Sequence, residues 1–139
     1  MIGSDGLPND EVPHPRLWGS FPRVLGRYSR DEAVLTLEDA VRKMTALPAE
    51  IFGLAPERGV LEVGAVADIV VFAPETVGDA ATFEEPTLPS TGIESVLVAG
   101  EVVYTGGEGS TGARPGRLLR RQSLPRAPMA DATFDGPHL

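Results

Sequence analysis

The 139-residue chain is predicted to have an α/β fold in which helices come first and strands follow. Two observations support this prediction. Apolar residues recur with a helical period between Phe21 and Phe52, and runs rich in β-branched residues begin only after Gly59. The predicted strands are few, and a single hairpin with one extra strand is only marginally stable in water. We therefore expect strands that need partners from outside the segment, as in a fragment of a larger protein.

The N-terminal region is predicted to be mostly irregular. Residues 1–3 are too short to form a strand with its own partner, and residues 4–22 show no periodicity and contain four prolines. This composition predicts a long loop over residues 4–22. Structureless loops of this length are uncommon inside compact domains and are often functional.

Three helical segments are expected after the loop. Residues 21–28 place apolar side chains at i, i+3, i+4 and i+7. Thr36 begins a sequence that resembles a capping box, and the following helix extends to Met44. Pro48 suits the first turn of a further short helix, and Gly53 suits its C-terminal cap.

The first strand is predicted over residues 67–72, where a short β-branched run is typical of a strand buried on both faces. Asp68 lies at the start of this run. We expect its carboxylate to accept backbone amides at the turn over residues 64–67, a structural role.

A hairpin is predicted farther along the chain. Residues 73–92 contain three prolines and read as a second loop. Two β-branched runs then flank Ala99-Gly100, the strongest hairpin signal in the sequence. From residue 124 onward we expect disorder.

Composition excludes several functional classes. There is no cysteine, so the chain can form neither a disulfide nor a thiolate zinc site of its own. The net charge of −8 argues against nucleic acid as a partner. No apolar run approaches the roughly 20 residues that span a bilayer. We therefore expect a soluble, cytoplasmic protein without a membrane partner.

Asp5 is the first candidate for chemistry. It stands where the apolar N-terminal residues give way to a glycine-bearing loop. A polar residue at the C-terminal end of a barrel strand points into the active site, and an aspartate there can serve as general base toward a metal-bound water. The alternative is an aspartate in an Asx turn before glycine.

Arg16 and His14 lie on the same predicted loop. Arg16 can direct two N–H groups at a substrate carboxylate, or it can be an exposed arginine paired with Asp10 or Glu11. His14 follows no metal-ligand spacing, and we interpret it as a residue that packs the loop.

These residues belong to stretches that resemble a known family. The stretches MIGSDGLP (1–8) and HPRLWGSFPRVLG (14–26) resemble the last barrel strand and following loop of N-acyl-D-amino-acid deacylases, or D-aminoacylases, of the amidohydrolase superfamily. LEDAVRKMT (37–45), LPA (47–49) and FGL (52–54) are similar to the helices that follow. RGVL (58–61) and ADIVVF (67–72) resemble the return to a small β-sandwich domain.

The resemblance implies a more specific fold. It implies the C-terminal fragment of an amidohydrolase TIM barrel (last strand end, loop, helices) followed by part of a small β-sandwich domain. Residues 1–57 would be the end of the metal-dependent barrel, residues 58–123 a partial β-sandwich, and residues 124–139 a disordered tail. A truncated reading frame or a split gene would explain such a fragment.

The resemblance also implies a function. Members of the family are zinc-dependent hydrolases that cleave the amide bond of N-acyl-D-amino acids. Asp5 matches their catalytic aspartate, and Arg16 matches the arginine that holds the substrate carboxylate. Their zinc ligands, histidines and a cysteine, lie on earlier strands, so we expect no metal ligands here and no activity from the isolated chain.

Two other functions remain open. The chain could be a fragment of another amidohydrolase-superfamily enzyme, a cyclic amidase or a dipeptidase. It could also be a non-catalytic module that associates with a separately encoded N-terminal barrel portion.

Overall fold

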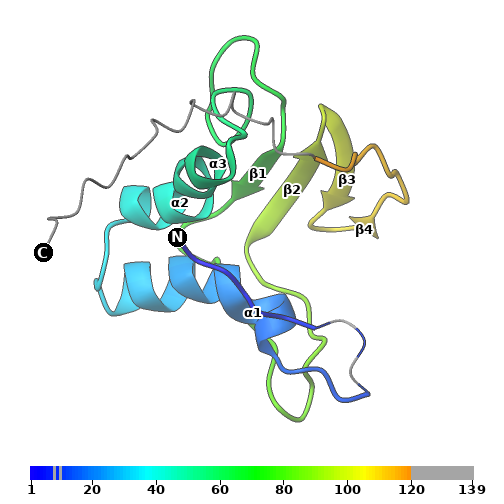
Figure 1. The fold of residues 1–139 in the computed structure, drawn as a ribbon. Helices are drawn as coiled ribbons and strands as arrows, with labels where there is room; N and C mark the ends of the chain where they lie inside the picture. The colour runs from blue at the N-terminus through cyan, green and yellow to red at the C-terminus, as the bar shows by residue number, and fades with distance from the viewer. Residues whose placement is uncertain (8, 10, 120–139) are drawn as a thin grey trace, which may run out of the picture.

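The computed structural model describes residues 1–7, 9 and 11–119, and Figure 1 shows helices on one side and a sheet on the other. The helices precede the strands, as predicted. The helical elements are α1 (Arg16–Arg23), the π-helix η1 (Val24–Asp31), α2 (Leu37–Met44) and α3 (Ala46–Phe52). The strands are β1 (Ile69–Phe72), β2 (Ile93–Val98), β3 (Glu101–Thr105) and β4 (Gly109–Ser110).

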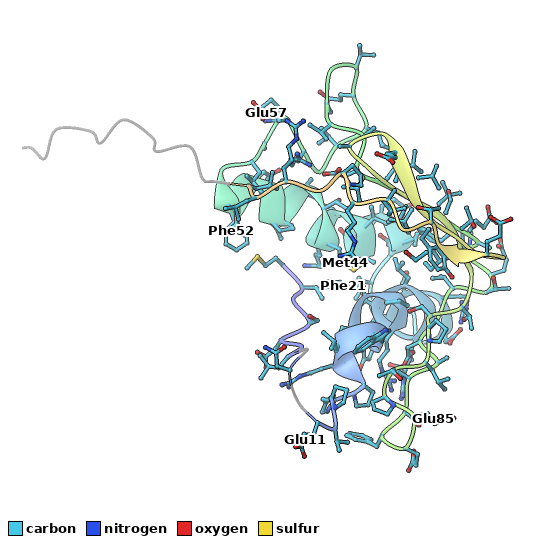
Figure 2. All side chains as sticks on the ribbon, turned by 90° about the vertical axis from the view of Figure 1, so that its right-hand side faces the viewer. Glu11, Phe21, Met44, Phe52, Glu57 and Glu85 are labelled. Carbon is cyan, nitrogen blue, oxygen red and sulfur yellow. The ribbon has the colours of Figure 1, made fainter. Side chains whose placement is uncertain are left out.

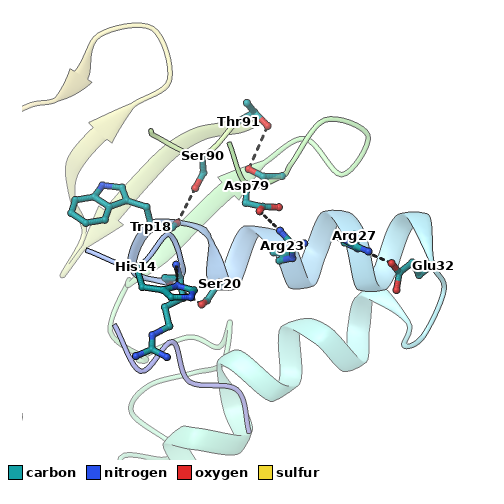
Figure 3. Close-up of polar contacts among 11 residues, drawn as sticks. His14, Trp18, Ser20, Arg23, Arg27, Glu32, Asp79, Ser90 and Thr91 are labelled. Carbon is teal, nitrogen blue, oxygen red and sulfur yellow. Dashed lines mark hydrogen bonds and ion pairs between the residues drawn. The ribbon is translucent and has the colours of Figure 1, made fainter. Parts of the chain in front are cut away.

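The prediction of a loop over residues 4–22 is wrong from Arg16 onward, because α1 begins there and contains Pro22. Pro22 has no N–H to donate to the carbonyl of Trp18 one turn earlier. The hydroxyl of Ser90 donates to that carbonyl instead, at 3.3 Å (Figure 3). A contact from another part of the chain thus satisfies a group that proline leaves unpaired.

The helix predicted over residues 21–28 is present, although from Val24 it widens into the π-helix η1. Its end shows the longer spacing, since the N–H of Glu32 donates to the carbonyl of Arg27, five residues earlier, at 2.9 Å. A helix commonly distorts where one of its backbone hydrogen bonds is missing, and Pro22, two residues before η1 begins, lacks the N–H for such a bond.

The predicted helix signals of α2 and α3 are confirmed. Thr36 caps α2, because its hydroxyl oxygen accepts the N–H of Asp39 at 3.1 Å. Pro48 lies in the first turn of α3. The helix ends at Gly53, which adopts the left-handed conformation with φ of 69°.

The core lies where the helices meet the segment between β1 and β2. Its buried residues are Val24, Leu25, Ala40 and Val77, and Phe72 and Ile93 of the sheet pack against them. Met44 of α2, near the middle of Figure 2, also packs there. Gly26 brings the helix close to this segment, since a Cβ at this position would stand 2.4 Å from the carbonyl oxygen of Val77.

The four strands form one antiparallel sheet in the order β1-β2-β3-β4. The predicted hairpin is confirmed as β2 and β3. Ala99 and Gly100 join them with φ of 50° and 83°, both positive, as a two-residue primed turn requires. The predicted loop over residues 73–92 contains one isolated bridge, between Gly78 and Thr91.

The prediction that the first strand is buried on both faces is wrong for this chain. Val70 and Val71 of β1 are 52% and 41% exposed. β1 is an edge strand of the sheet, and within the part of the chain that the structure describes only β2 pairs with it. Phe72 is the residue of β1 that packs against the core.

The predicted role of Asp68 is also corrected. Its carboxylate does not serve the turn over residues 64–67. It accepts the N–H of Ala99 at 2.9 Å and pairs with Arg58. Asp68 therefore fastens the β2–β3 turn to the start of β1, which is still a structural role.

Residues 1–3 form no strand in the described structure, in line with the expectation that this stretch is too short to form a strand with its own partner. Ile2 instead donates its N–H to the carbonyl of Lys43 at 3.0 Å and packs against the core. This bond satisfies a carbonyl at the C-terminal end of α2. The disorder expected over residues 124–139 lies outside the described residues.

Helices α1, η1, α2 and α3 are all too short to cross a bilayer, and no helix in the described ranges combines the required length and apolar character.

Gly26→Ala tests the close approach of the helix to Val77. Alanine in a helix interior normally gains about 1 kcal/mol over glycine. Overpacking against a backbone carbonyl typically costs about 1–3 kcal/mol. We expect this cost to exceed the gain in helix propensity, so that the variant is less stable than the parent. Urea denaturation of the full chain, followed by circular dichroism, measures it. Gly107→Ala is the control, since a Cβ there meets nothing within 4 Å. Equal stability of the two variants would contradict this packing.

Candidate functional site

Asp5 projects from the N-terminal segment in an unusual backbone conformation. Its φ is 50°, in the left-handed region that aspartate tolerates better than most residues, and its side chain is 84% exposed. The turn here is made by Ser4, whose hydroxyl oxygen accepts the N–H of Gly6 at 3.3 Å. The Asp5 carboxylate is thereby left facing solvent, where it can contact a ligand.

Gly6 allows α1 to begin beside Asp5. A Cβ on Gly6 would lie 2.6 Å from Cδ1 and 2.8 Å from Cα of Leu17. No side chain fits in this space. The glycine that follows Asp5 in the sequence therefore has a packing reason, which is to bring the first turn of α1 against the Asp5 loop.

Arg16, the first residue of α1, forms an ion pair with Asp5. Its Nη2 lies 3.2 Å from Oδ2 of Asp5. Its Nε is buried and has no hydrogen-bond partner among the described residues. Asp10, one of the alternative partners considered from the sequence, lies outside those residues. The two candidate residues are thus adjacent, and the Arg16 side chain as a whole is 40% exposed.

His14 packs the loop before α1, as expected. Its Nδ1 accepts the backbone N–H of Arg16 at 3.0 Å. Its ring meets Phe83 edge to face, with centroids 5.0 Å apart and an interplanar angle of 77°. His14 thus contacts both Arg16 and the segment between β1 and β2.

The helix that carries Arg16 is fixed by an interface with residues 74–79, which we call the helix–loop interface. Arg23 donates to the carboxylate of Asp79 at 2.6 Å (Figure 3), and this hydrogen bond raises the pKa of the Arg23 guanidinium above its ordinary value. Arg30 donates to the carbonyl of Val77 at 2.7 Å. Gly19 faces Asp79 along the same side of the helix.

Sequence reasoning did not identify Asp79, Phe83 or Ser90 as neighbours of the site. Each lies in the second loop, more than fifty residues from its partner on α1 or the preceding loop. Residue type and local spacing contain no signal for such pairs.

A shallow hollow of about 600 Å³ adjoins the helix–loop interface and is lined by several arginines. These arginines are already paired. Arg27 contacts Glu32 at 2.7 Å, and Arg30 contacts Asp31 at 2.8 Å. With its charges matched in this way, the hollow has no free cationic group to attract an anion.

The described part of the chain contains no candidate zinc site. Within residues 1–7, 9 and 11–119 there is no group of three or more histidine, cysteine, aspartate or glutamate side chains that could hold a metal ion. The full sequence contains two histidines and no cysteine. Ligand sets that contain cysteine are therefore excluded for this chain.

The arginine at the start of α1 and the aspartate beside it belong to the stretches whose sequence indicated an amidohydrolase. The model of the amidohydrolase family matches residues 1–104, and the chain belongs to that family. The family predicted from the motifs is confirmed.

Two curated relatives come from Alcaligenes xylosoxydans xylosoxydans. The chain is 63% identical over 123 residues to an N-acyl-D-glutamate deacylase, covering 88% of this chain and 25% of the relative. It is 59% identical over 121 residues to a D-aminoacylase, covering 87% of this chain and 25% of the relative. The chain therefore spans about a quarter of the length of the curated relatives it matches.

Solved structures agree with the sequence comparison. The crystal structure of a D-aminoacylase superposes with a TM-score of 0.83 at 60% identity, covering 87% of this chain and 25% of that one. An N-acyl-D-glutamate deacylase from Bordetella bronchiseptica, complexed with zinc and a phosphonate inhibitor, gives 0.80 at 62% identity, covering 86% and 25%. The described fold is thus similar to one part of these larger enzymes.

Asp79→Asn tests the helix–loop interface. Loss of the charged partner of Arg23 should lower the free energy of unfolding by about 1 kcal/mol, a modest value because Arg23 is partly exposed. Thermal melts of the full chain followed by circular dichroism measure this change. Asp31→Asn removes an exposed carboxylate paired with its sequence neighbour, and we expect a change below about 0.5 kcal/mol. If Asp79→Asn were as mild as this control, the ion pair would not hold the helix.

Proposed function

We propose that the chain is the C-terminal part of a zinc-dependent N-acyl-D-amino-acid deacylase. The observation that carries the proposal is the pairing of Asp5 with Arg16 at 3.2 Å within the motif that resembles the deacylases. Identities of 63% and 59% to an N-acyl-D-glutamate deacylase and a D-aminoacylase support it. We accordingly propose an N-acyl-D-amino acid as the substrate of the whole protein.

In this proposal Asp5 is the general base and then the general acid. It takes a proton from the water that attacks the amide carbonyl, and it returns that proton to the amine nitrogen as the C–N bond breaks. The exposed carboxylate and the left-handed backbone of Asp5 support this role, since strained residues cluster at functional sites.

Arg16 is proposed to bind the free carboxylate of the substrate. A guanidinium presents N–H groups in a planar fork that matches a carboxylate. The Arg16 side chain is 40% exposed, so part of its guanidinium can be reached by a ligand.

We propose that the zinc ion of the whole enzyme is held outside this chain, since the described residues contain no group of side chains that could hold a metal ion. The division into a barrel end over residues 1–57 and a partial β-sandwich over residues 58–123 stays a prediction. It is supported by the order of elements, with the helices before residue 57 and the sheet after it.

The isolated chain should not hydrolyse N-acetyl-D-glutamate when zinc is supplied. Asp5 and Arg16 are present, but the proposal places the residues that hold the metal outside this chain. Release of free amine from the substrate measures activity, with the Asp5→Asn chain as background. Turnover above that background would show that this chain is catalytically sufficient and would overturn the proposal that it is one part of the enzyme.

A chimera tests the roles of the two residues. The matching 123 residues of the Alcaligenes N-acyl-D-glutamate deacylase are replaced with those of this chain. We expect the chimera to be active. Asp5→Asn should lower kcat by about 10²–10⁴-fold, the usual contribution of a general base. Arg16→Lys should raise KM roughly 10–100-fold, since lysine cannot present the planar fork.

Glu62→Gln in the chimera is the matched control, because Glu62 is an exposed carboxylate on another part of the chain. It should change neither constant. If Asp5→Asn behaved like Glu62→Gln, Asp5 would not be the base. If the complete gene product preferred hydantoins or dipeptides to N-acyl-D-amino acids, the cyclic amidase or dipeptidase alternative would replace the present proposal.

A further inference from the structure

We propose that His14 is a positioning residue for Arg16, and that Phe83 holds the His14 ring in the orientation this requires. The inference deepens the proposed function, on which it rests for the role of Arg16 in carboxylate binding. It makes the second loop, through Phe83, a determinant of substrate binding.

The first step is the start of α1, which lacks an ordinary cap. Its N-cap residue is Pro15, and no side-chain cap bond is made there. His14 replaces the cap. Its ring Nδ1 accepts the N–H of Arg16 at 3.0 Å, and its carbonyl accepts the N–H of Leu17 at 3.1 Å. One residue thus satisfies the first two amides of the helix.

The second step is the protonation state that this geometry requires. A ring nitrogen accepts a hydrogen bond only when it carries no proton. In the arrangement observed, the neutral ring of His14 must therefore carry its proton on Nε2. An asparagine can offer a side-chain oxygen to the amide two residues ahead in the same way, whereas a phenylalanine cannot.

The third step is the contact that fixes the ring. Phe83 meets His14 edge to face at 5.0 Å, the arrangement that aromatic pairs prefer. Glu11 and Glu85, which mark the two loops involved, lie at the same end of the molecule in Figure 2. The second loop is itself fixed to the helix by the bonds of Asp79 to Arg23 and of Ser90 to Trp18.

The fourth step links the cap to the site. Arg16 is the residue whose amide His14 accepts, and its guanidinium lies 3.2 Å from Asp5. Loss of the bond to Nδ1 frees the first helical residue, and with it the direction of the guanidinium. Misplacement of a binding group by about 1 Å is enough to weaken a site markedly.

The tautomer can be measured on the full chain without any assay of activity. Long-range ¹H–¹⁵N correlation in mildly alkaline buffer distinguishes a protonated Nε2 from a protonated Nδ1. The spectrum of His14→Asn assigns the signals, since His138 is the other histidine. We expect the proton on Nε2 of His14 and a shifted amide resonance of Arg16 in the variant. A proton on Nδ1 would overturn the inference.

Three substitutions in the active chimera separate the effect of the acceptor from that of the ring contact. His14→Phe keeps an aromatic ring against Phe83 but removes the acceptor, and it should raise KM for N-acetyl-D-glutamate roughly tenfold with little change in kcat. His14→Asn keeps an acceptor and should stay within about threefold of the parent. Phe83→Leu should fall between them.

A substrate whose α-carboxylate is converted to a carboxamide shows whether the effect passes through Arg16. His14→Phe should leave kcat/KM for this compound unchanged, because the charge that Arg16 recognises is gone. Equal losses on both substrates would mean that His14 only stabilises the fold, and the inference would fail. An inactive chimera would instead count against the proposed function, while the tautomer measurement still decides the role of His14.

Discussion

The close approach of the α1–η1 helix to residues 74–79 is the constraint on which the rest of the structure depends. Val77 is almost completely buried, and its carbonyl both accepts a hydrogen bond from Arg30 and lies where a side chain on Gly26 would clash. Because residues 74–79 follow β1 directly and lead toward β2, this contact joins the helices to the sheet. The small core forms around it, and only five hydrophobic residues of the described chain are buried.

The relative position of Asp5 and Arg16 in the candidate site depends on the same contact, although neither residue takes part in it. Asp5 comes from the N-terminal segment, which Ile2 attaches to α2, whereas Arg16 comes from the helix held by the helix–loop interface. The two residues meet because Gly6 lets these separately held segments touch at Leu17. Their exposed ion pair contributes little to stability. Its geometry is therefore a result of packing elsewhere, as expected for a site built on a rigid framework.

Local patterns predicted the elements whose causes are local. The caps of α2 and α3 and the Ala99-Gly100 turn were found because each depends on a few adjacent residues. The start of α1 was missed because Pro15 and Pro22 imitate a loop. Asp5 and Arg16 were proposed for the candidate site from their local pattern and the family motif, while Phe83 and Asp79 reach that site only through the fold. Burial of Val70 and Val71 was predicted from residue type, which does not show what surrounds an edge strand.

The proline in α1 has a consequence for what stabilises this helix. Pro22 cannot give the Trp18 carbonyl its usual donor four residues ahead, and the hydroxyl that bonds this carbonyl comes from Ser90, 72 residues later. A helix is usually the most local of structures, built from neighbouring residues. Part of the stability of α1 therefore comes from a contact with a distant segment of the chain.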